Sequence, residues 1–387
     1  MLVRLRVDRP KPPEVRDVFV TIGGWYLADR PDERIAVTVG GTELPVSYQR
    51  RPDVERVHPT YHSSGFSAFL DLRAFRGLTS EVEATVAGNG VSRRINLPIL
   101  PEARALADGW DRDKLDKLST IRGLLQCPTC QVAGTLFDIV GGLRCERCGD
   151  CYEANGSHFN MLHADLRAQF DVTPNDRISQ HPYGPESRKA IHHASQRGGL
   201  TLDVGAGFRP RPASDIVCLE IAAYPSTDVV GVGQRLPFAD GSFDAVVSKA
   251  VFEHVTDPFA CAAELVRVTA PGGRIFCSAP LLAPEHAFPH HYYNMTRQGL
   301  VNLFRSTNAR VVETYLPLSG HPAEAVAWIL NVYHAQLPPE LTERFMKMTV
   351  ADLLALRKNR DDPMFAALSE DGRRILAATT AVMLEKD

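Results

Sequence analysis

Two closely spaced pairs of cysteines constrain the fold of this chain more than any other feature. Cys127 and Cys130 form one C-x2-C pair, and after fourteen intervening residues Cys145 and Cys148 form another. Each pair predicts a tight turn that directs two thiolates toward one point. Two such turns at this spacing are typical of a tetrahedral zinc ribbon. We therefore expect these four cysteines to bind one zinc ion.

A fifth cysteine, Cys151, provides an alternative ligand. The pair Cys148 and Cys151 has the same spacing as Cys145 and Cys148. Gly149 directly follows Cys148 in the run CERCGD, and a glycine after the second cysteine favours Cys145 with Cys148. In either case four thiolates close the coordination sphere of zinc, so the predicted role of the metal is structural.

Residues 1–105 predict an accessory β-sandwich. The runs DVFVTIGGWYL, RIAVTVGGTELPVSY and VEATVAGNGVSRRINLPI alternate apolar and polar residues, as half-buried strands do. Glycines at 40–41 and at 88 and 90 lie between runs, where hairpin turns require a positive φ. Several short strands at this spacing are typical of two packed sheets.

The second half of the chain predicts a parallel α/β sheet. The apolar run 200–204 is followed by Gly205 and Gly207, a glycine-rich turn that lets a ligand approach the backbone closely. A second apolar run ends at Glu220, 17 residues after Asp203, where a nucleotide-binding sheet has its acceptor for ribose hydroxyls. Further apolar runs alternate with helical patterns, and this alternation predicts helices on both faces of the sheet.

Residues of about 185–318 resemble the class I S-adenosylmethionine-dependent methyltransferases. The motifs of that family occur in order: LDVGAG, an acidic residue ending the second strand, LPFADGSFDAVVS, EHV and RVTAPGG. The resemblance implies a Rossmann-like fold that binds S-adenosylmethionine. It also implies a set of cofactor-binding residues: Asp203, Gly205 and Gly207 at the methionine end, Glu220 at the ribose hydroxyls, and Gln234, Arg235 and Leu236 near the adenine.

The chain departs from that family near the adenine. An aspartate that caps the adenine amino group is expected near Val232, but the run GVGQRLPF has no carboxylate. The amide oxygen of Gln234 is the candidate replacement. Without such a replacement we expect the affinity for the cofactor to be reduced.

Histidines follow the fourth and fifth predicted strands. His254 comes directly after Glu253, and His290 and His291 lie in the run PEHAFPHHYYNMT. Ligands bind at the carboxyl ends of strands in open α/β sheets, and histidine is the near-neutral base that a hydroxyl acceptor needs. These four residues are the predicted catalytic set. Two alternatives remain: Glu253 and His254 hold the loop and the cofactor without proton transfer, or His286, His290 and His291 form a second metal site or a polar loop.

Residues of about 120–162 resemble the zinc ribbons of the tRNA-methyltransferase activator family. The segment begins LLQCPTC and ends in a similar short tail that contains Tyr152, Gly156, Met161 and Leu162. Some bacterial ribosomal-RNA guanine methyltransferases also have a ribbon before their catalytic domain. Residues 111–151 carry six basic and six acidic side chains, whereas a module that grips phosphates needs an excess of positive charge. We therefore expect the ribbon to serve as a scaffold or an interface.

The predicted organisation has three parts: an accessory β-sandwich over 1–105, a zinc ribbon over 118–163, and a methyltransferase domain over 180–387 with a helical extension from about 320. The favoured function is transfer of a methyl group from S-adenosylmethionine to a hydroxyl of a sugar or glycan intermediate, in polysaccharide biosynthesis. The first alternative is an RNA base methyltransferase, and the second is a non-catalytic methyltransferase-like scaffold.

Charge and hydropathy limit the partners and the location of the chain. The formal net charge of −3 argues against a broad nucleic-acid surface, so a small-molecule or glycan substrate is favoured over nucleic acid. No apolar run approaches the roughly 20 residues that a membrane span needs. The first residues lack the apolar core of a signal peptide, so we expect a cytoplasmic protein. The oligomeric state is left open.

Overall fold

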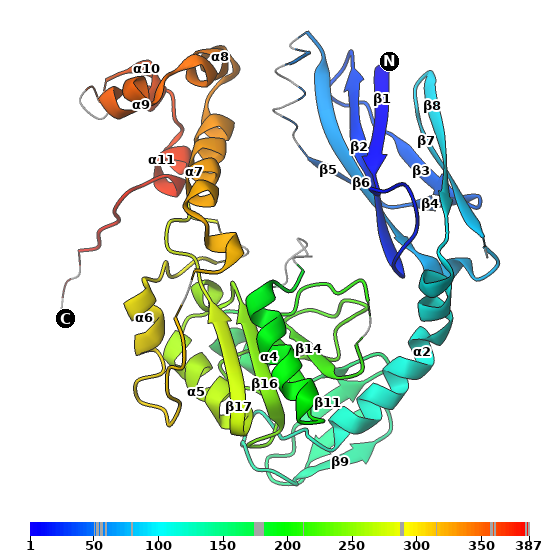
Figure 1. The fold of residues 1–387 in the computed structure, drawn as a ribbon, viewed down its shortest axis with the longest axis vertical. Coiled ribbons are helices and arrows are strands. Elements are labelled where there is room, and N and C mark those ends of the chain that lie inside the picture. Colours follow the sequence, from blue (N-terminus) through cyan, green and yellow to red (C-terminus); the bar gives the residue numbers. More distant parts are fainter. Residues whose placement is uncertain are drawn as a thin grey trace. The chain divides into compact units, whose positions relative to one another are not determined.

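The computed structural model describes two compact units (Figure 1). The first unit comprises Met1–Lys117 and Arg209–Ser214, and the second comprises Leu118–Phe208 and Asp215–Asp387. Within these bounds the structure describes all residues except 50, 52–53, 55–56, 59, 79, 174–181, 212, 287–289, 315, 357–358, 360, 384 and 386–387. In the described part of the chain no helix is both long and apolar enough to cross a membrane.

The first unit contains two four-stranded antiparallel sheets, with strand orders β1-β2-β6-β5 and β4-β3-β7-β8. Their strands are β1 (Leu2–Arg9), β2 (Phe19–Ala28), β3 (Ala36–Val39), β4 (Thr42–Leu44), β5 (Val46–Gln49), β6 (His62–Asp71), β7 (Glu81–Gly88) and β8 (Val91–Pro98). In β7 the buried residues Val82, Ala84 and Val86 alternate with more exposed neighbours, as one buried face of a sheet requires. The strands predicted near the N-terminus are confirmed as two antiparallel sheets.

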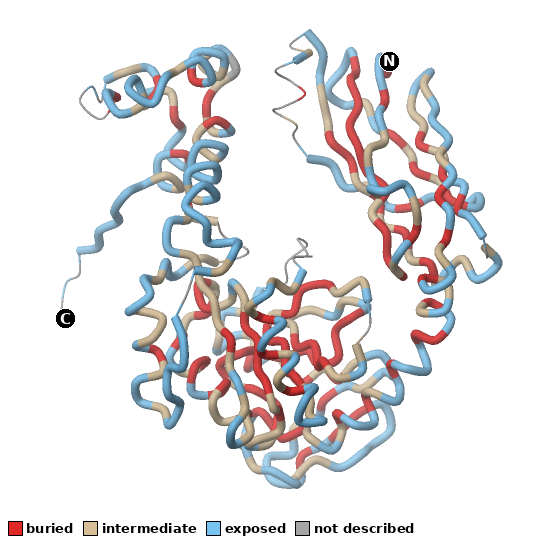
Figure 2. Tube along the Cα trace, in the orientation of Figure 1, coloured by how far each residue is buried: buried red, intermediate tan, exposed pale blue. Residues whose placement is uncertain are grey.

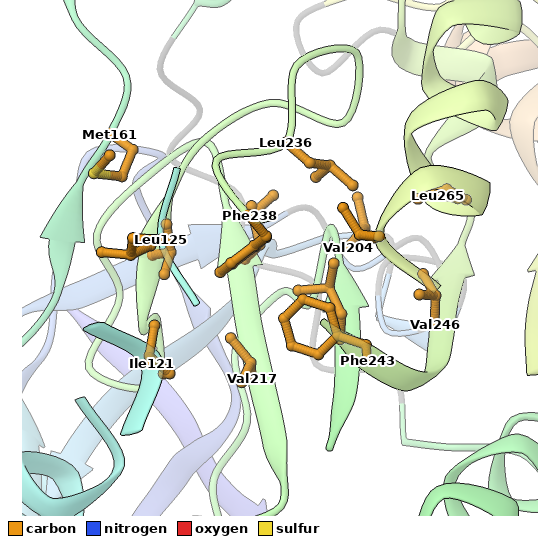
Figure 3. Packing of buried hydrophobic residues seen from close by; sticks show 14 of the residues in the cluster. Ile121, Leu125, Met161, Val204, Val217, Leu236, Phe238, Phe243, Val246 and Leu265 are labelled. Carbon is orange, nitrogen blue, oxygen red and sulfur yellow. The ribbon is translucent and has the colours of Figure 1, made fainter. Parts of the chain in front are cut away.

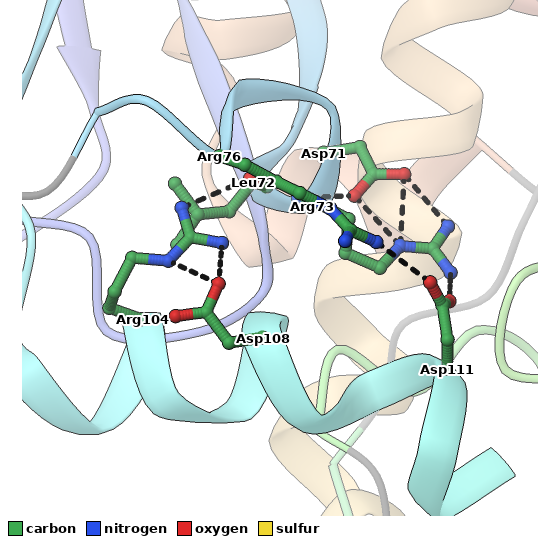
Figure 4. Close-up of polar contacts among 7 residues, drawn as sticks. All are labelled: Asp71, Leu72, Arg73, Arg76, Arg104, Asp108 and Asp111. Atoms are coloured by element: carbon green, nitrogen blue, oxygen red, sulfur yellow. Dashed lines mark hydrogen bonds and ion pairs between the residues drawn. The ribbon is translucent and has the colours of Figure 1, made fainter.

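Helix α2 (Pro101–Arg122) is attached to the first unit by ion pairs (Figure 4). The Arg104 guanidinium pairs with Asp108 at 2.7 Å and donates to the carbonyl of Leu72 at 3.4 Å. Asp111 pairs with Arg76 at 2.9 Å. Leu72 begins the short 3-10 helix η1 (Leu72–Phe75) directly after β6. These contacts hold the first half of α2 against the end of β6.

A nine-stranded sheet forms the centre of the second unit, in the order β17-β16-β13-β14-β15-β12-β11-β10-β9. Its parallel part consists of β13 (Thr201–Val204), β14 (Ile216–Glu220), β15 (Val229–Val230), β16 (Phe243–Lys249) and β17 (Thr269–Ser278). The helices beside it are α3 (Ala164–Gln169), α4 (Pro185–Gln196) and α5 (Pro258–Val268), with the 3-10 helix η2 (Phe252–His254).

The helices α4 and α5 cover opposite faces of the parallel strands. Ala245 of β16 packs in a cluster with Ala190 of α4. The next residue, Val246, belongs to a different cluster, together with Leu265 of α5. Because successive residues of a strand point to opposite faces, the two helices lie on opposite sides of the sheet. The predicted Rossmann-like sheet is confirmed.

Four strands from the segment that contains the cysteine pairs continue this sheet. They are β9 (Leu136–Ile139), β10 (Gly142–Cys145), β11 (Cys151–Ala154) and β12 (Phe159–Asn160), and neighbours among them pair antiparallel. Strand β12 then pairs parallel with β15, so that Phe159 lies opposite Val229. The N–H of Phe159 donates to the carbonyl of Asp228 at 2.9 Å, and that of Met161 donates to Val230 at 2.9 Å.

The first cysteine turn is attached to the same sheet by a second set of main-chain bonds. The N–H of Gln126 donates to the carbonyl of Pro237 at 3.0 Å, and the N–H of Ala239 donates to that of Leu124 at 2.9 Å. One hydrophobic core follows this junction: Leu125 and Met161 lie in the same cluster as Phe238 (Figure 3). The cysteine segment, which we call the ribbon, and the parallel strands therefore share both a sheet and a core.

The chain ends in helices. After Ser278 the described residues form loops and helices and no further strand. The helices are α6 (Arg297–Asn302), α7 (Pro322–Gln336), α8 (Pro339–Lys347), α9 (Val350–Leu356), α10 (Pro363–Ala366) and α11 (Glu370–Ile375), with the 3-10 helix η3 (Leu318–Gly320). A small core forms around Leu337, Phe345 and Met364, whereas most of α7 is exposed (Figure 2). The predicted C-terminal helices are confirmed.

The shared core generates a test of how the ribbon is attached. Phe159 is 8% exposed at the junction with β15, whereas Phe137 is 38% exposed in β9 at the outer edge of the sheet. We expect Phe159→Ala to lower the free energy of unfolding of the second unit by about 3 kcal/mol or more, because a buried ring leaves a cavity. The matched control Phe137→Ala should cost less than about 1 kcal/mol. Equal effects in urea unfolding would contradict a shared core.

Candidate functional site

A glycine turn follows the end of β13. Gly205 and Gly207 have φ values of +69° and +64°, which side-chain-bearing residues rarely adopt. A Cβ atom on Gly205 would lie only 2.3 Å from Cγ2 of Val251, in the segment after β16. The turn therefore requires glycine, and it brings the end of β13 against the segment that leads to Glu253.

Glu220 is held at the end of β14 by two main-chain donors. The N–H of Gly207 donates to its Oε1 at 2.7 Å, and the N–H of Ile221 donates to its Oε2 at 2.9 Å. These bonds fix the carboxylate beside the glycine turn. Each carboxylate oxygen accepts more than one hydrogen bond, so both can also accept ribose hydroxyls.

Asp203 lies in β13, just before the glycine turn, and is buried. The hydroxyl of Tyr183 donates to its Oδ2 at 2.5 Å. Tyr183 comes from the segment before α4, and the sequence analysis did not single it out. Its signal is weak, because a lone tyrosine before a helix belongs to no motif in this chain.

The three residues predicted near the adenine form a turn of their own. The N–H of Arg235 donates to the carbonyl of Val232 at 3.2 Å, which closes the turn. Gln234 is buried, with Nε2 3.5 Å from Oγ1 of Thr256, a residue close to His254 in the chain. Leu236 packs in the hydrophobic core, and its N–H donates to Oε2 of Glu264 at 2.7 Å. The turn thus connects the cofactor side of the sheet to the segment after η2.

Glu253, His254, His286 and His291 gather beside this turn. Nε2 of His254 lies 3.9 Å from Oε1 of Glu253. The ring of His286 lies 5.3 Å from that of His254 and 4.2 Å from that of His291, between centroids. The structure thus brings together three of the four predicted catalytic residues and adds His286.

Hydrogen bonds determine which ring nitrogens of this cluster remain open. Nδ1 of His254 donates to the carbonyl of His290 at 2.6 Å, and Nδ1 of His286 donates to that of Pro284 at 2.9 Å. Both rings therefore present Nε2. His291 differs, because its Nε2 donates to the carbonyl of Tyr293 at 3.1 Å while its Nδ1 accepts the N–H of His286 at 3.2 Å. His291 holds the loop together.

The fourth predicted residue, His290, has its ring elsewhere. Its Nε2 lies 3.2 Å from Oδ2 of Asp171, in the segment after α3. Its carbonyl, by contrast, accepts the bond from His254. His290 therefore meets the cluster through its backbone rather than through its imidazole.

Burial shifts the pKa values of the cluster in the direction that favours the uncharged form of each side chain. Glu253 is 1% exposed, and neither carboxylate oxygen has a hydrogen-bond partner among the described residues. Burial raises the pKa of the Glu253 carboxyl to about 7. Burial also lowers the pKa of His254 and of His286 below the usual value for histidine. An imidazole in this site is therefore ready to accept a proton at neutral pH.

The cysteine cluster lies in the ribbon. Sγ of Cys127 is 3.6 Å from that of Cys148, Sγ of Cys130 is 3.7 Å from that of Cys145, and all four sulfurs lie within 4.8 Å of one another. Four sulfurs bound to one zinc ion at about 2.3 Å lie about 3.8 Å apart, so the cluster fits zinc. Cys151 is exposed and points its sulfur at the carbonyl of Gly149.

A buried tyrosine supports this cluster. The Tyr152 hydroxyl lies 3.2 Å from Sγ of Cys127 and 3.0 Å from Oγ1 of Thr129. A hydroxyl donor to a thiolate orients the ligand and stabilises its charge. Tyr152 also belongs to the core shared with the parallel strands, so the metal-binding turns are packed directly on the catalytic half.

Comparison with known proteins identifies the parallel sheet. A family model described as a methyltransferase domain matches residues 213–277. An uncharacterized methyltransferase of Mycolicibacterium paratuberculosis is 38% identical over 155 residues, which are 35% of this chain and 57% of that protein. One of Schizosaccharomyces pombe is 38% identical over 72 residues, which are 18% of this chain and 26% of that protein. The chain thus spans little more than half the length of the mycobacterial relative.

A solved structure gives a weaker likeness. The S-adenosylmethionine-dependent methyltransferase of Thermotoga maritima is 18% identical, with a TM-score of 0.23 over 31% of this chain and 69% of that chain. A likeness of this size bears on neither substrate nor mechanism. The sequence matches show that the chain contains a class I S-adenosylmethionine-dependent methyltransferase domain. The family match does not cover the ribbon, so the resemblance of the ribbon to the activator family stays a prediction.

The cysteine geometry generates a test of the metal ligands. We expect Cys148→Ser to remove one zinc ion per chain, because Cys148 lies within the four-sulfur cluster. Cys151→Ser is the matched control and should keep that zinc. Elemental analysis of the parent and both variants measures the difference. Zinc loss in Cys151→Ser alone would move the fourth ligand to Cys151.

The position of Glu220 generates a second test. Charge-assisted hydrogen bonds are each worth roughly 1.5–3 kcal/mol, so Glu220→Ala should weaken S-adenosylmethionine binding by at least about tenfold. Glu220→Gln keeps the shape but loses the charge and should lose less affinity. Calorimetry gives the affinities, and thermal melting shows whether each variant is folded. Unchanged affinity in folded Glu220→Ala would rule out the ribose role.

Proposed function

We propose that the chain transfers a methyl group from S-adenosylmethionine to a hydroxyl oxygen of a sugar or glycan intermediate. One observation carries this proposal: a glycine turn with an acidic partner contacts the segment that leads to a carboxylate and histidine cluster. Gly205 contacts Val251, only two residues before Glu253, and Gln234 contacts Thr256, two residues after His254. Cofactor residues and proton-accepting residues are therefore neighbours.

The glycine turn, Glu220 and Gln234 fit S-adenosylmethionine, whose methyl group is already activated because it is bound to a sulfonium. Gly207 lets the ligand lie close to the backbone, Gly205 lets Val251 pack against the turn, and Glu220 accepts the ribose hydroxyls. Gln234 is the candidate acceptor for the adenine amino group, since the run GVGQRLPF around Val232 has no carboxylate. The main catalytic task of these residues is to hold the methyl carbon in line with the acceptor and to exclude water.

An oxygen acceptor explains the histidine cluster. A hydroxyl must lose its proton as the new bond forms, whereas a neutral ring nitrogen in RNA needs no base. His254 presents Nε2 toward Glu253 in a half-buried site, with its Nδ1 fixed by the carbonyl of His290. We therefore assign the uptake of the acceptor proton to the cluster that contains His254.

Exposed aromatic side chains near the cluster support a sugar acceptor. The ring of Trp328 lies 4.8 Å from that of His286 and is 39% exposed, and Tyr292 and Tyr293 are also exposed. Aromatic rings with polar edges suit the mixed apolar and polar faces of a sugar. The same rings suit bases of RNA, but the carboxylate of Asp171, which accepts from the Tyr292 hydroxyl at 2.8 Å, opposes a phosphate backbone.

The ribbon has a supporting role in this proposal. The pairing of β12 with β15 and the shared core support the view that the ribbon stabilises the methyltransferase sheet within the same chain. A scaffold without activity is the remaining alternative, motivated by the missing carboxylate near Val232. Binding of S-adenosylmethionine in calorimetry, followed by transfer of its tritiated methyl group into fractionated cell glycans, tests the proposed function. Label found only in RNA would show that the acceptor is RNA and not a glycan. Label in neither fraction would favour a scaffold without activity.

The cluster generates a prediction for catalysis. His254→Ala should lower kcat by roughly 10²–10⁴-fold, with the affinity for S-adenosylmethionine nearly intact. The matched control is His192→Ala, on the exposed side of α4, which should leave kcat unchanged. Because burial lowers the pKa of His254, the parent rate should rise with pH through a value below the usual 6.5 and then level off. A parent-like rate in His254→Ala would exclude His254 from catalysis.

A further inference from the structure

One group of side chains in the catalytic half has the composition of a metal site. We propose that Glu253, His254 and His286 bind one divalent transition-metal ion, distinct from the zinc of the cysteine cluster. Each of the three offers one ligand atom, and these atoms all lie within 4.8 Å of one another. They come from two segments, since Glu253 and His254 form the end of η2 and His286 follows β17.

The hydrogen bonds of the two histidines match the pattern that metal ligands usually show. A metal-bound imidazole usually donates its other N–H to a backbone carbonyl or a carboxylate, which fixes the tautomer and the ring orientation. Nδ1 of His254 and Nδ1 of His286 each donate to a backbone carbonyl. Nε2 is therefore the unprotonated nitrogen in both rings, and that of His254 lies 3.9 Å from Oε1 of Glu253.

The third ligand gives independent support. Glu253 is 1% exposed, and neither oxygen of its carboxylate has a hydrogen-bond partner among the described residues. Burying a carboxylate without a partner is expensive, and a structural role would be served equally well by an apolar side chain. A bound cation supplies the missing partner. The nearest ligand atom to Oε1 is Nε2 of His254, at 3.9 Å.

The donor set limits which ions fit. Two imidazole nitrogens and one carboxylate oxygen suit zinc, iron(II), manganese(II) or cobalt(II), whereas magnesium and calcium prefer oxygen ligands throughout. Ligand atoms of one such ion lie roughly 3.0–3.4 Å apart. The Glu253 and His254 atoms must therefore approach by less than about 1 Å, a change that side-chain rotation supplies. Three protein ligands leave coordination positions open.

The catalytic consequence rests on the proposed function. An acceptor hydroxyl in an open position would lose its proton more easily, because a bound cation lowers the pKa of an oxygen ligand. The acceptor oxygen forms the bond to the methyl carbon as the carbon–sulfur bond breaks. Sulfur keeps that electron pair and becomes a neutral thioether, and the hydroxyl proton passes to solvent. When the ion is bound, the ion activates the hydroxyl, and His254 acts as a metal ligand and not as the base.

Binding of two probe ions tests the site. In the first experiment the zinc-loaded protein is titrated with Mn²⁺, and binding is measured as the loss of the free Mn²⁺ signal in electron paramagnetic resonance. In the second it is titrated with further Zn²⁺, and binding is measured by calorimetry. We expect one additional ion per chain. Loss of an outer-shell partner alone costs 10–100-fold in affinity, so Glu253→Gln, His254→Ala and His286→Ala should each weaken binding at least about 100-fold.

The matched control is His290→Ala, in the same loop as His286, which should keep the additional ion because its ring pairs with Asp171 instead. Binding of neither probe, or binding unaffected by the three ligand variants, would overturn the site. Ion binding is measured without any acceptor, so it fails or succeeds separately from the proposed methyl transfer. Full methyl transfer by protein that lacks the additional ion would overturn the catalytic consequence and leave His254 as the base.

Discussion

The two-residue pairing of β12 with β15 is the interaction on which the second unit depends. Without it, β15 would be the edge of the parallel sheet, with unpaired backbone groups and apolar side chains facing water. Phe159 and Val229 face each other across this pair, and both are buried. The cysteine turns flank the hairpins that lead to β12, so a metal ion bound by the four cysteines would stabilise the sheet that carries the glycine turn.

The two side-chain clusters of this unit differ in what they can do. The four cysteines would saturate a tetrahedral ion and leave no position for a substrate, so their expected contribution is to folding. Glu253, His254 and His286 are the proposed ligands of a second ion, and three ligands would leave coordination positions open for a substrate. Glu253 is costly for stability because it is buried with no partner among the described residues. Such a cost is retained at sites where it serves chemistry.

Much of the catalytic half could be predicted from the sequence because its signals are local. The turn after β13 needs glycine at 205 and 207, where φ is positive, and the carboxylate of Glu220 lies at the end of the next strand. The hydrogen bond from the Tyr183 hydroxyl to Asp203 was not predictable in this way. It joins residues 20 positions apart in the chain, and nothing in a tyrosine's immediate neighbours specifies such a contact.

The sequence by itself determined the elements and the chemistry: two cysteine turns, an alternating N-terminal third, a glycine turn and histidines after two strands. These follow from residue spacing, because local backbone geometry depends on near neighbours. Only the tertiary structure decided which distant parts meet. It joined the ribbon to the parallel sheet, gathered Cys148 rather than Cys151, and brought His286 instead of the His290 ring to His254. Such choices depend on strand order and packing, which residue spacing does not encode.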